Sequence, residues 1–239
     1  YNGGETKISA DLSSYMNGYQ DPRREIYGVT STFDESENIT NGFHGLRVGN
    51  EYPIKTGQCY SNVKVEVSSP IMWMNAAEVM FLRAEAALRG WDTEKTPKAY
   101  YEAGIRLSFE QLGAKNVEDY LVSTNTPESY KDPLGTYSFS GTPSTISVQW
   151  KDGNFEESLE RIITQKWISF FPTLSSVAWT EYRRTGYPKL IPIPSDLNYS
   201  NGAIDTELQI RRLPFTQSEY RGNTEEVNKA LGLLKGPDN

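Results

Sequence analysis

The residues that could carry out chemistry are few in this sequence. His44 is the only histidine and Cys59 the only cysteine among 239 residues, so any nucleophile–histidine pair would have to use His44. His44 lies in the turn-forming segment Asn41-Gly-Phe-His-Gly45, with no nucleophile motif nearby. One imidazole and one thiol cannot form a histidine-based zinc site, a four-thiolate site or an internal disulfide. The sequence therefore predicts no enzyme, no metal site and no cofactor.

Acidic residues offer two weaker patterns. The segment Asp152-Gly-Asn154-Phe-Glu156 is similar to the start of a calcium loop but has no glycine at position 6 and no glutamate at position 12. It is more typical of a turn and an N-cap before a helix. A glycosidase needs two carboxyl groups about 5–9 Å apart, which a sequence does not supply. Because most acids here fall near helix starts, where the macrodipole favours them, a glycosidase stays a remote alternative.

The pair Arg183-Arg184 comes at the end of a predicted helix that contains Trp179. Two arginines there could hold an anionic ligand. They also suit the last carbonyl groups of a helix and acidic residues across a helix interface. We interpret this pair as structural.

Aromatic residues are the unusual feature of the composition, with 15 Tyr, 9 Phe and 5 Trp making up 12%. Tyrosine and tryptophan have flat faces that can stack on sugar rings, and a polar group that can form a hydrogen bond. Aromatics within periodic helical segments are expected in the core, namely Tyr101, Phe109, Trp167, Phe170 and Trp179. Those in loops, including Tyr15, are expected at the surface, where loops carry function.

These loop positions supply the predicted ligand-binding residues, which are Tyr19, Tyr27, Phe43, His44, Arg47, Tyr52 and Tyr60. The predicted hydrogen-bonding partners of ligand hydroxyl groups are Asn17, Gln20, Asn41 and Asn50, together with Arg47.

Charge and hydropathy argue against binding to nucleic acid and against a membrane-spanning segment. The net charge is −7 and the pI is about 5.0, and no basic stripe is present that could displace counterions from nucleic acid. The longest uncharged stretch, residues 133–150, is mostly Ser, Thr, Gly and Pro, whereas a membrane span needs about 20 mainly apolar residues. The chain opens at Tyr1 without a signal-like segment, so we expect a piece of a longer protein.

The elements predicted along the chain are mainly helical. Residues 1–69 form a loop-rich surface region rather than a core, with a strand-like run at 63–67. Helices are predicted over residues 71–89, 97–112, 116–123, 155–170 and 174–186, followed by two short helices beginning at Thr216 and Asn223, where the sequence fits capping boxes. A small hairpin is expected between residues 137–139 and 146–150.

We therefore predict one mainly α domain of tetratricopeptide-like helical hairpins with long loop insertions and a few short strands. Residues 1–69 would be the aromatic-bearing insertion, and residues 70–239 the helical region.

Four segments carry a family resemblance. They are Met74-Asn-Ala-Ala-Glu-Val-Met-Phe-Leu-Arg-Ala-Glu-Ala-Ala-Leu-Arg-Gly90, Gln165-Lys-Trp167, Trp179-x-Glu-Tyr-Arg-Arg-Thr-Gly-Tyr-Pro188, and Arg211-Arg-Leu-Pro-Phe215 with Glu219-x-x-x-Asn223. Their order and spacing resemble the C-terminal half of the SusD/RagB family over roughly residues 15–239. The family's N-terminal half, with its lipidated cysteine, and its usual Trp-Trp-Asp near the C-terminal end have no counterpart in this sequence.

The resemblance implies a surface-exposed outer-membrane lipoprotein of Bacteroidota, held by a lipid anchor outside this chain. Such proteins bind glycans, or in some branches peptides, without catalysis and pass them to a SusC-like TonB-dependent transporter. The alternative is a helical scaffold or lid that contacts only the transporter, or a peptide-binding member, with the ligand site in the N-terminal half. Loop aromatics exposed around one concavity would favour the first function, and loop aromatics buried under helices would favour the alternative.

Overall fold

The computed structural model describes residues 6–35, 38–49, 59–91, 93–200 and 204–234. The chain forms two compact units, residues 1–191 and 192–239. Both sides of the boundary expected at residues 69–70 lie in the first unit, which we call unit 1. Residues 192–239, unit 2, are described separately.

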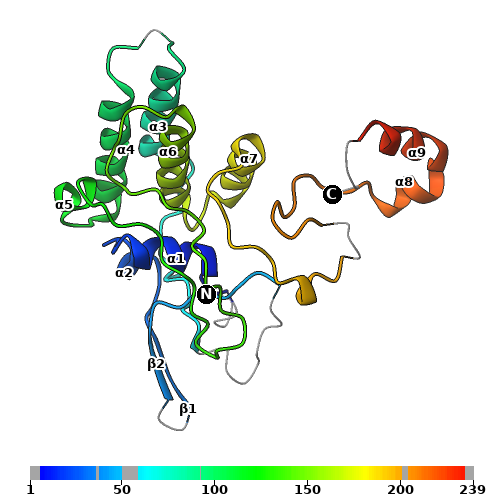
Figure 1. Cartoon of the computed structure of the whole chain (residues 1–239), viewed down its shortest axis with the longest axis horizontal. Helices are drawn as coiled ribbons and strands as arrows, with labels where there is room; N and C mark the ends of the chain where they lie inside the picture. Colours follow the sequence, from blue (N-terminus) through cyan, green and yellow to red (C-terminus); the bar gives the residue numbers. More distant parts are fainter. Residues whose placement is uncertain (1–5, 36–37, 50–58, 92, 201–203, 235–239) are drawn as a thin grey trace. The chain divides into compact units, whose positions relative to one another are not determined.

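Unit 1 is mainly helical, as predicted (Figure 1). Its helices are α1 (Ala10–Gly18), α2 (Arg24–Tyr27), α3 (Ala76–Leu88), α4 (Pro97–Leu112), α5 (Val117–Leu121), α6 (Phe155–Phe170) and α7 (Ser175–Thr185). Its strands, β1 (Ser31–Glu35) and β2 (Asn38–Gly42), pair antiparallel with Ser31 opposite Gly42.

The helical hairpin of α3 and α4 is built from local capping signals. The side chain of Asn75 accepts a hydrogen bond from the Ala77 N–H, so α3 begins five residues later than predicted. The Thr96 side chain caps α4, and Gly113 ends it in the left-handed conformation. Gly104 of α4 has no side chain where the Phe81 ring of α3 approaches, and a Cβ there would lie 2.7 Å from that ring. The two helices can therefore pack closely.

Helix α6 packs against α3, α4 and α7 and carries much of the core. The Asn154 side chain accepts hydrogen bonds from the N–H groups of Glu156 and Glu157, which confirms the predicted cap at this turn. Gly186 ends α7 at a φ of 77°.

Two strand predictions are wrong. Residues 63–67 form only a single bridge, between Val63 and Gly28. Residues 146–150 form no strand, because the alternating side chains of Val148 and Trp150 turn into the core from an irregular backbone.

The N-terminal segment is part of the core, so the prediction of a surface region is wrong for α1. Ile8, Leu12, Tyr15 and Met16 are fully buried in one cluster with side chains of α3, α4 and α6. Polar residues of α1 such as Ser13 are buried as well. A helix buried on nearly all sides has no amphipathic pattern, which is why α1 was not recognisable in the sequence.

Unit 2 contains a short 3-10 helix, η3 (Ser195–Leu197), and the helices α8 (Gln217–Gly222) and α9 (Thr224–Leu233). The two helices begin where predicted, but neither Thr216 nor Asn223 makes a side-chain capping hydrogen bond.

None of the helices in the described parts of either unit is long and apolar enough to cross a membrane.

Candidate ligand-binding surfaces

Most of the predicted ligand-binding residues are buried. Tyr19, Tyr27, Phe43 and Tyr60 are at most 6% exposed, so the expectation that they lie at the surface is wrong. Tyr15 is also buried. Contact of these side chains with a ligand stays a prediction that no observation tests.

The buried tyrosines have a structural role that the sequence did not reveal. Five of them donate hydrogen bonds from their hydroxyl groups to backbone carbonyl groups of distant segments. The pairs are Tyr15 with Lys189, Tyr19 with Ile146, Tyr27 with Ile168, Tyr101 with Val148 and Tyr130 with Gly45, at 2.6–3.1 Å. Four of these carbonyl groups belong to irregular segments, where a buried carbonyl group has no ladder partner and needs a donor, and the Ile168 carbonyl group lies in the last turn of α6. These five tyrosines therefore fix loops and a helix end.

The other predicted residues are also part of this framework. The Arg47 side chain is buried and donates to the carbonyl groups of Tyr137 and Ser138, at 2.8 and 3.3 Å. His44 is half-buried, and its backbone N–H donates to the Ser61 hydroxyl group.

The residues predicted to hydrogen-bond ligand hydroxyl groups differ in their surroundings. Asn17 donates to the Phe43 carbonyl group, and Gln20 is exposed at a positive φ. The side chain of Asn41 and residues Asn50 and Tyr52 lie outside what the structure describes.

A buried polar cluster joins the N-terminal segment to three helices. The guanidinium group of Arg23 is fully buried and makes a bidentate pair with Asp21, with distances of 3.0 and 2.6 Å. It also donates to Ser108 of α4, Tyr120 of α5 and Gln165 of α6. Burial disfavours its charge, but the carboxylate outweighs this effect and raises the arginine pKa. The cluster is fully paired, which makes it structural rather than a ligand site.

Helix α1 is tied to residues 188–191 through a buried carboxyl group. Asp11 is 5% exposed, and its side chain accepts a hydrogen bond from the Ile191 N–H at 2.6 Å. Burial raises the pKa of Asp11 to about 6, although the hydrogen bond from Ile191 opposes the shift.

The arginine pair at the end of α7 has the structural role we interpreted for it. Arg184 makes a bidentate pair with Glu85 of α3, at 2.7 and 2.6 Å, and a further pair with Glu181. The ammonium group of Lys166, from α6, lies 3.3 Å from Glu181. Arg183 lies over the Trp179 ring. The charges therefore bridge α3, α6 and α7.

Trp91 is an exposed aromatic side chain in unit 1, directly after α3. Its side chain is 68% exposed, and its backbone N–H donates to the Ala86 carbonyl group. Gly90, in the left-handed conformation, completes this helix end. The sequence signal was present in Gly90-Trp91, a tryptophan just past a predicted helix end.

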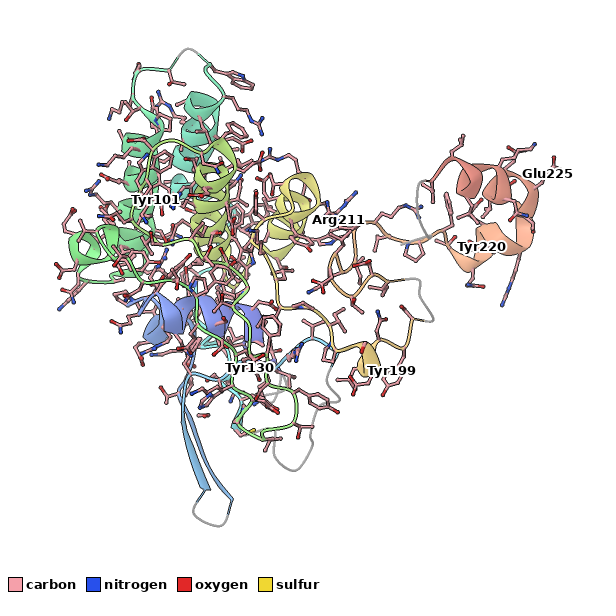
Figure 2. The ribbon with its side chains drawn as sticks, in the orientation of Figure 1. Tyr101, Tyr130, Tyr199, Arg211, Tyr220 and Glu225 are labelled. Carbon is pink, nitrogen blue, oxygen red and sulfur yellow. The ribbon has the colours of Figure 1, made fainter. Side chains whose placement is uncertain are left out.

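Tyr199, labelled in Figure 2, is an aromatic residue of unit 2. Its side chain is 73% exposed. The adjacent Asn198 is held by two hydrogen bonds, because its amide donates to the Ile204 carbonyl group at 2.7 Å and its oxygen accepts from the Ser200 hydroxyl group at 2.6 Å. Tyr199 therefore presents a stacking face between residues that carry amide and hydroxyl groups. Both exposed positions suit binding of a flat, hydroxylated ligand by stacking.

Within the described residues, no group of three or more His, Cys, Asp and Glu side chains could hold a metal ion. Helical hairpins, long loops held by buried hydrogen bonds and exposed aromatic side chains together define a tetratricopeptide-like protein with surfaces suited to binding. The comparison with family models gives the family. A model of the SusD-like family, described as SusD and RagB outer-membrane lipoproteins, matches residues 1–239, and the chain belongs to this family.

Solved structures agree with this assignment. A SusD homologue from Bacteroides uniformis is 46% identical, with a TM-score of 0.85, over 97% of this chain and 47% of that chain. A SusD homologue from Bacteroides ovatus is 47% identical, with a TM-score of 0.83, over 95% and 47%. A chitin-binding SusD homologue from Flavobacterium johnsoniae is 43% identical, with a TM-score of 0.79, over 98% and 48%. The chain therefore spans about half the length of these relatives.

A comparison with curated proteins found no match. The family consists of outer-membrane lipoproteins, which supports an outer-membrane location, and its members are known as non-catalytic binding proteins.

The role of the buried phenols predicts the effect of removing one hydroxyl group. Tyr19→Phe leaves the Ile146 carbonyl group without its donor and should lower the free energy of unfolding by about 1 kcal/mol. Tyr100→Phe is the matched control, because the buried Tyr100 hydroxyl group has no hydrogen-bond partner. All five tryptophans lie in unit 1, so urea unfolding followed by tryptophan fluorescence measures the right part of the chain. Equal losses in the two variants would contradict this role.

The raised pKa of Asp11 predicts a pH-dependent stability. Because the folded pKa, about 6, exceeds the ordinary value of 3.8, the contribution of Asp11 to the stability of unit 1 should fall as the pH rises from about 4 to 7. A difference of about two units between the folded and unfolded pKa corresponds to roughly 3 kcal/mol of unfolding free energy. Asp11→Asn keeps an acceptor for the Ile191 N–H but does not titrate, so its stability relative to wild type should increase over this range. Unfolding at pH 4.5 and 7 tests this, and a pH-independent difference would contradict it.

The exposed Asp119→Asn serves as the control for this pH experiment. It makes the same change in formal charge at an exposed position of α5, without removing a buried contact, and should change the free energy of unfolding by less than about 0.5 kcal/mol.

Proposed function

We propose that the protein is a non-catalytic glycan-binding component at the cell surface that delivers its ligand to a SusC-like TonB-dependent transporter. The observation that carries this proposal is family membership together with 43% identity to a chitin-binding SusD homologue over nearly the whole chain. The ligand class we propose first is therefore a chitin-type oligosaccharide.

Trp91 and Tyr199 are the contact positions in this chain that the chemistry favours. Each has an exposed aromatic face on a loop held by backbone or amide hydrogen bonds, so little ordering is needed when a ligand binds. The two residues belong to different units, and we propose each as a separate contact.

A second candidate function is supported by the burial of Tyr19, Tyr27, Phe43 and Tyr60. With these side chains inside the framework, this part of the protein could act as a scaffold or transporter lid. The ligand contacts, for a glycan or a peptide, would then belong to the part of the family's length that this chain does not span.

Affinity electrophoresis through gels containing soluble chitin derivatives, with plant, host and other fungal polysaccharides as comparison, distinguishes the two. We expect retardation by the chitin derivative without release of reducing ends. Trp91→Ala or Tyr199→Ala should weaken binding by about 1 kcal/mol, or roughly fivefold, through loss of a stacking face. Val122→Ala, at an exposed position after α5, is the control.

Three outcomes would change the proposal. Retardation that neither aromatic substitution affects would remove these two contact positions but keep the function. No retardation by any polysaccharide would favour the scaffold. Reducing-end release would contradict a non-catalytic role.

A further inference from the structure

The last residues of unit 1 are attached to buried polar groups of α1. Residues 188–191 lie shortly after α7 and run directly into unit 2. The Ile191 N–H donates to the Asp11 carboxyl group at 2.6 Å, and the Tyr15 hydroxyl group donates to the Lys189 carbonyl group at 2.9 Å. We call residues 188–191 the strap. It is attached to α1 through the backbone at two of its four residues.

Side-chain contacts complete the attachment of the strap. The Ile191 side chain is buried and packs in one cluster with Ala10 and Tyr130. The exposed Lys189 ammonium group lies 3.3 Å from the buried Glu160 carboxylate of α6. The strap has no helix or strand of its own, so these contacts and the two hydrogen bonds from α1 hold it in place.

Asp11 is the group in this attachment whose charge changes near neutral pH. Desolvation raises the pKa of Asp11 to about 6, and it outweighs the opposing effects of the Ile191 N–H, the N–H of Asp11 itself and the charge of Arg47. The nearby Tyr15 stays neutral over this range, because burial raises its pKa well above the ordinary value. The other charged groups at the strap are Glu160 and Lys189, which pair with each other.

Opening of the strap changes the surroundings of this carboxyl group. The attached strap helps to keep water away from Asp11, and an opened strap lets water reach it. Because hydration stabilises the ionised form, ionisation shifts the equilibrium toward the opened state. A carboxyl oxygen accepts the Ile191 N–H in either protonation state, so the attachment remains possible throughout and only its free energy changes.

We propose that Asp11 is a proton-sensitive anchor between α1 and the strap that leads into unit 2. The strap stays attached while the carboxyl group is protonated and opens more readily when it is ionised. Opening adds residues 188–191 to the connection between the units, so unit 2 then has a longer flexible link. The device uses neither Trp91 nor Tyr199, so it can fail without affecting the proposed glycan binding.

Residue-resolved hydrogen exchange of the intact chain at pH 4.5 and 7.5 tests this proposal. After correction for the intrinsic rate of each amide, exchange gives the equilibrium constant for opening. For the Ile191 N–H this constant should be about 25-fold larger at pH 7.5, if Asp11 returns on opening from a pKa of about 6 to its ordinary 3.8. The Trp91 N–H, which donates to the Ala86 carbonyl group at the end of α3, should change by less than about twofold.

Two variants separate the protonation of Asp11 from the attachment of the strap. Asp11→Asn keeps an oxygen acceptor for the Ile191 N–H but does not ionise, so opening should be equal at the two pH values. Tyr15→Phe removes the other backbone hydrogen bond to the strap. It should increase opening about fivefold at both pH values and keep the difference of about 25-fold between them.

Two results would overturn the proposal. A change at Ile191 of less than about threefold between the two pH values would mean that opening does not hydrate Asp11. A change in Asp11→Asn as large as in the wild-type chain would mean that another group, such as Glu160, controls opening. If Asp11→Asn does not fold, the comparison of the Ile191 and Trp91 amides in the wild-type chain and in Tyr15→Phe still decides.

Discussion

The rest of unit 1 depends on the buried guanidinium group of Arg23. A charge with no exposed surface needs partners for all its donors, because the penalty of burying it unpaired is several kcal/mol. Its partners come from four places in the chain, namely Asp21, Ser108, Tyr120 and Gln165. The aromatic rings of α4 and α5 lie over its flat face. This requirement fixes the N-terminal segment against α4, α5 and α6 in one arrangement.

The tyrosine hydroxyl groups extend the same constraint to the loops. Five buried phenols place an apolar ring in the core and donate to a backbone carbonyl group of a distant segment, while Tyr60 and Tyr120 donate to the carboxylates of Asp132 and Asp21. Rings of the N-terminal segment and the helices meet edge to face, as Tyr15 does with Tyr19 and Trp167. A chain with this use for its aromatics presents few of them to a ligand. Among the described residues, three aromatic side chains are more than 60% exposed, namely Trp73, Trp91 and Tyr199.

The sequence was sufficient to predict the ends of helices, because caps depend on neighbouring residues. The caps at Thr96, Asn154 and Gly186 placed helix ends within a residue or two, and the resemblance of four segments in order identified the family. It was insufficient where burial depends on distant partners. Nothing near Tyr19 in the sequence shows that its hydroxyl group meets a carbonyl group 127 residues away. Helix α1 is buried on most sides, so it had no periodicity to detect.

The claim that residues 8–28, 43–47 and 59–63 form framework rather than a ligand surface is tested most directly by equilibrium unfolding of Arg23→Met, followed by tryptophan fluorescence. The variant leaves Asp21 buried without its partner and should lose about 3–5 kcal/mol of unfolding free energy. Arg24→Met, which removes the partly exposed arginine of a surface pair, should lose less than about 1 kcal/mol. Similar, small losses in both variants would contradict the account.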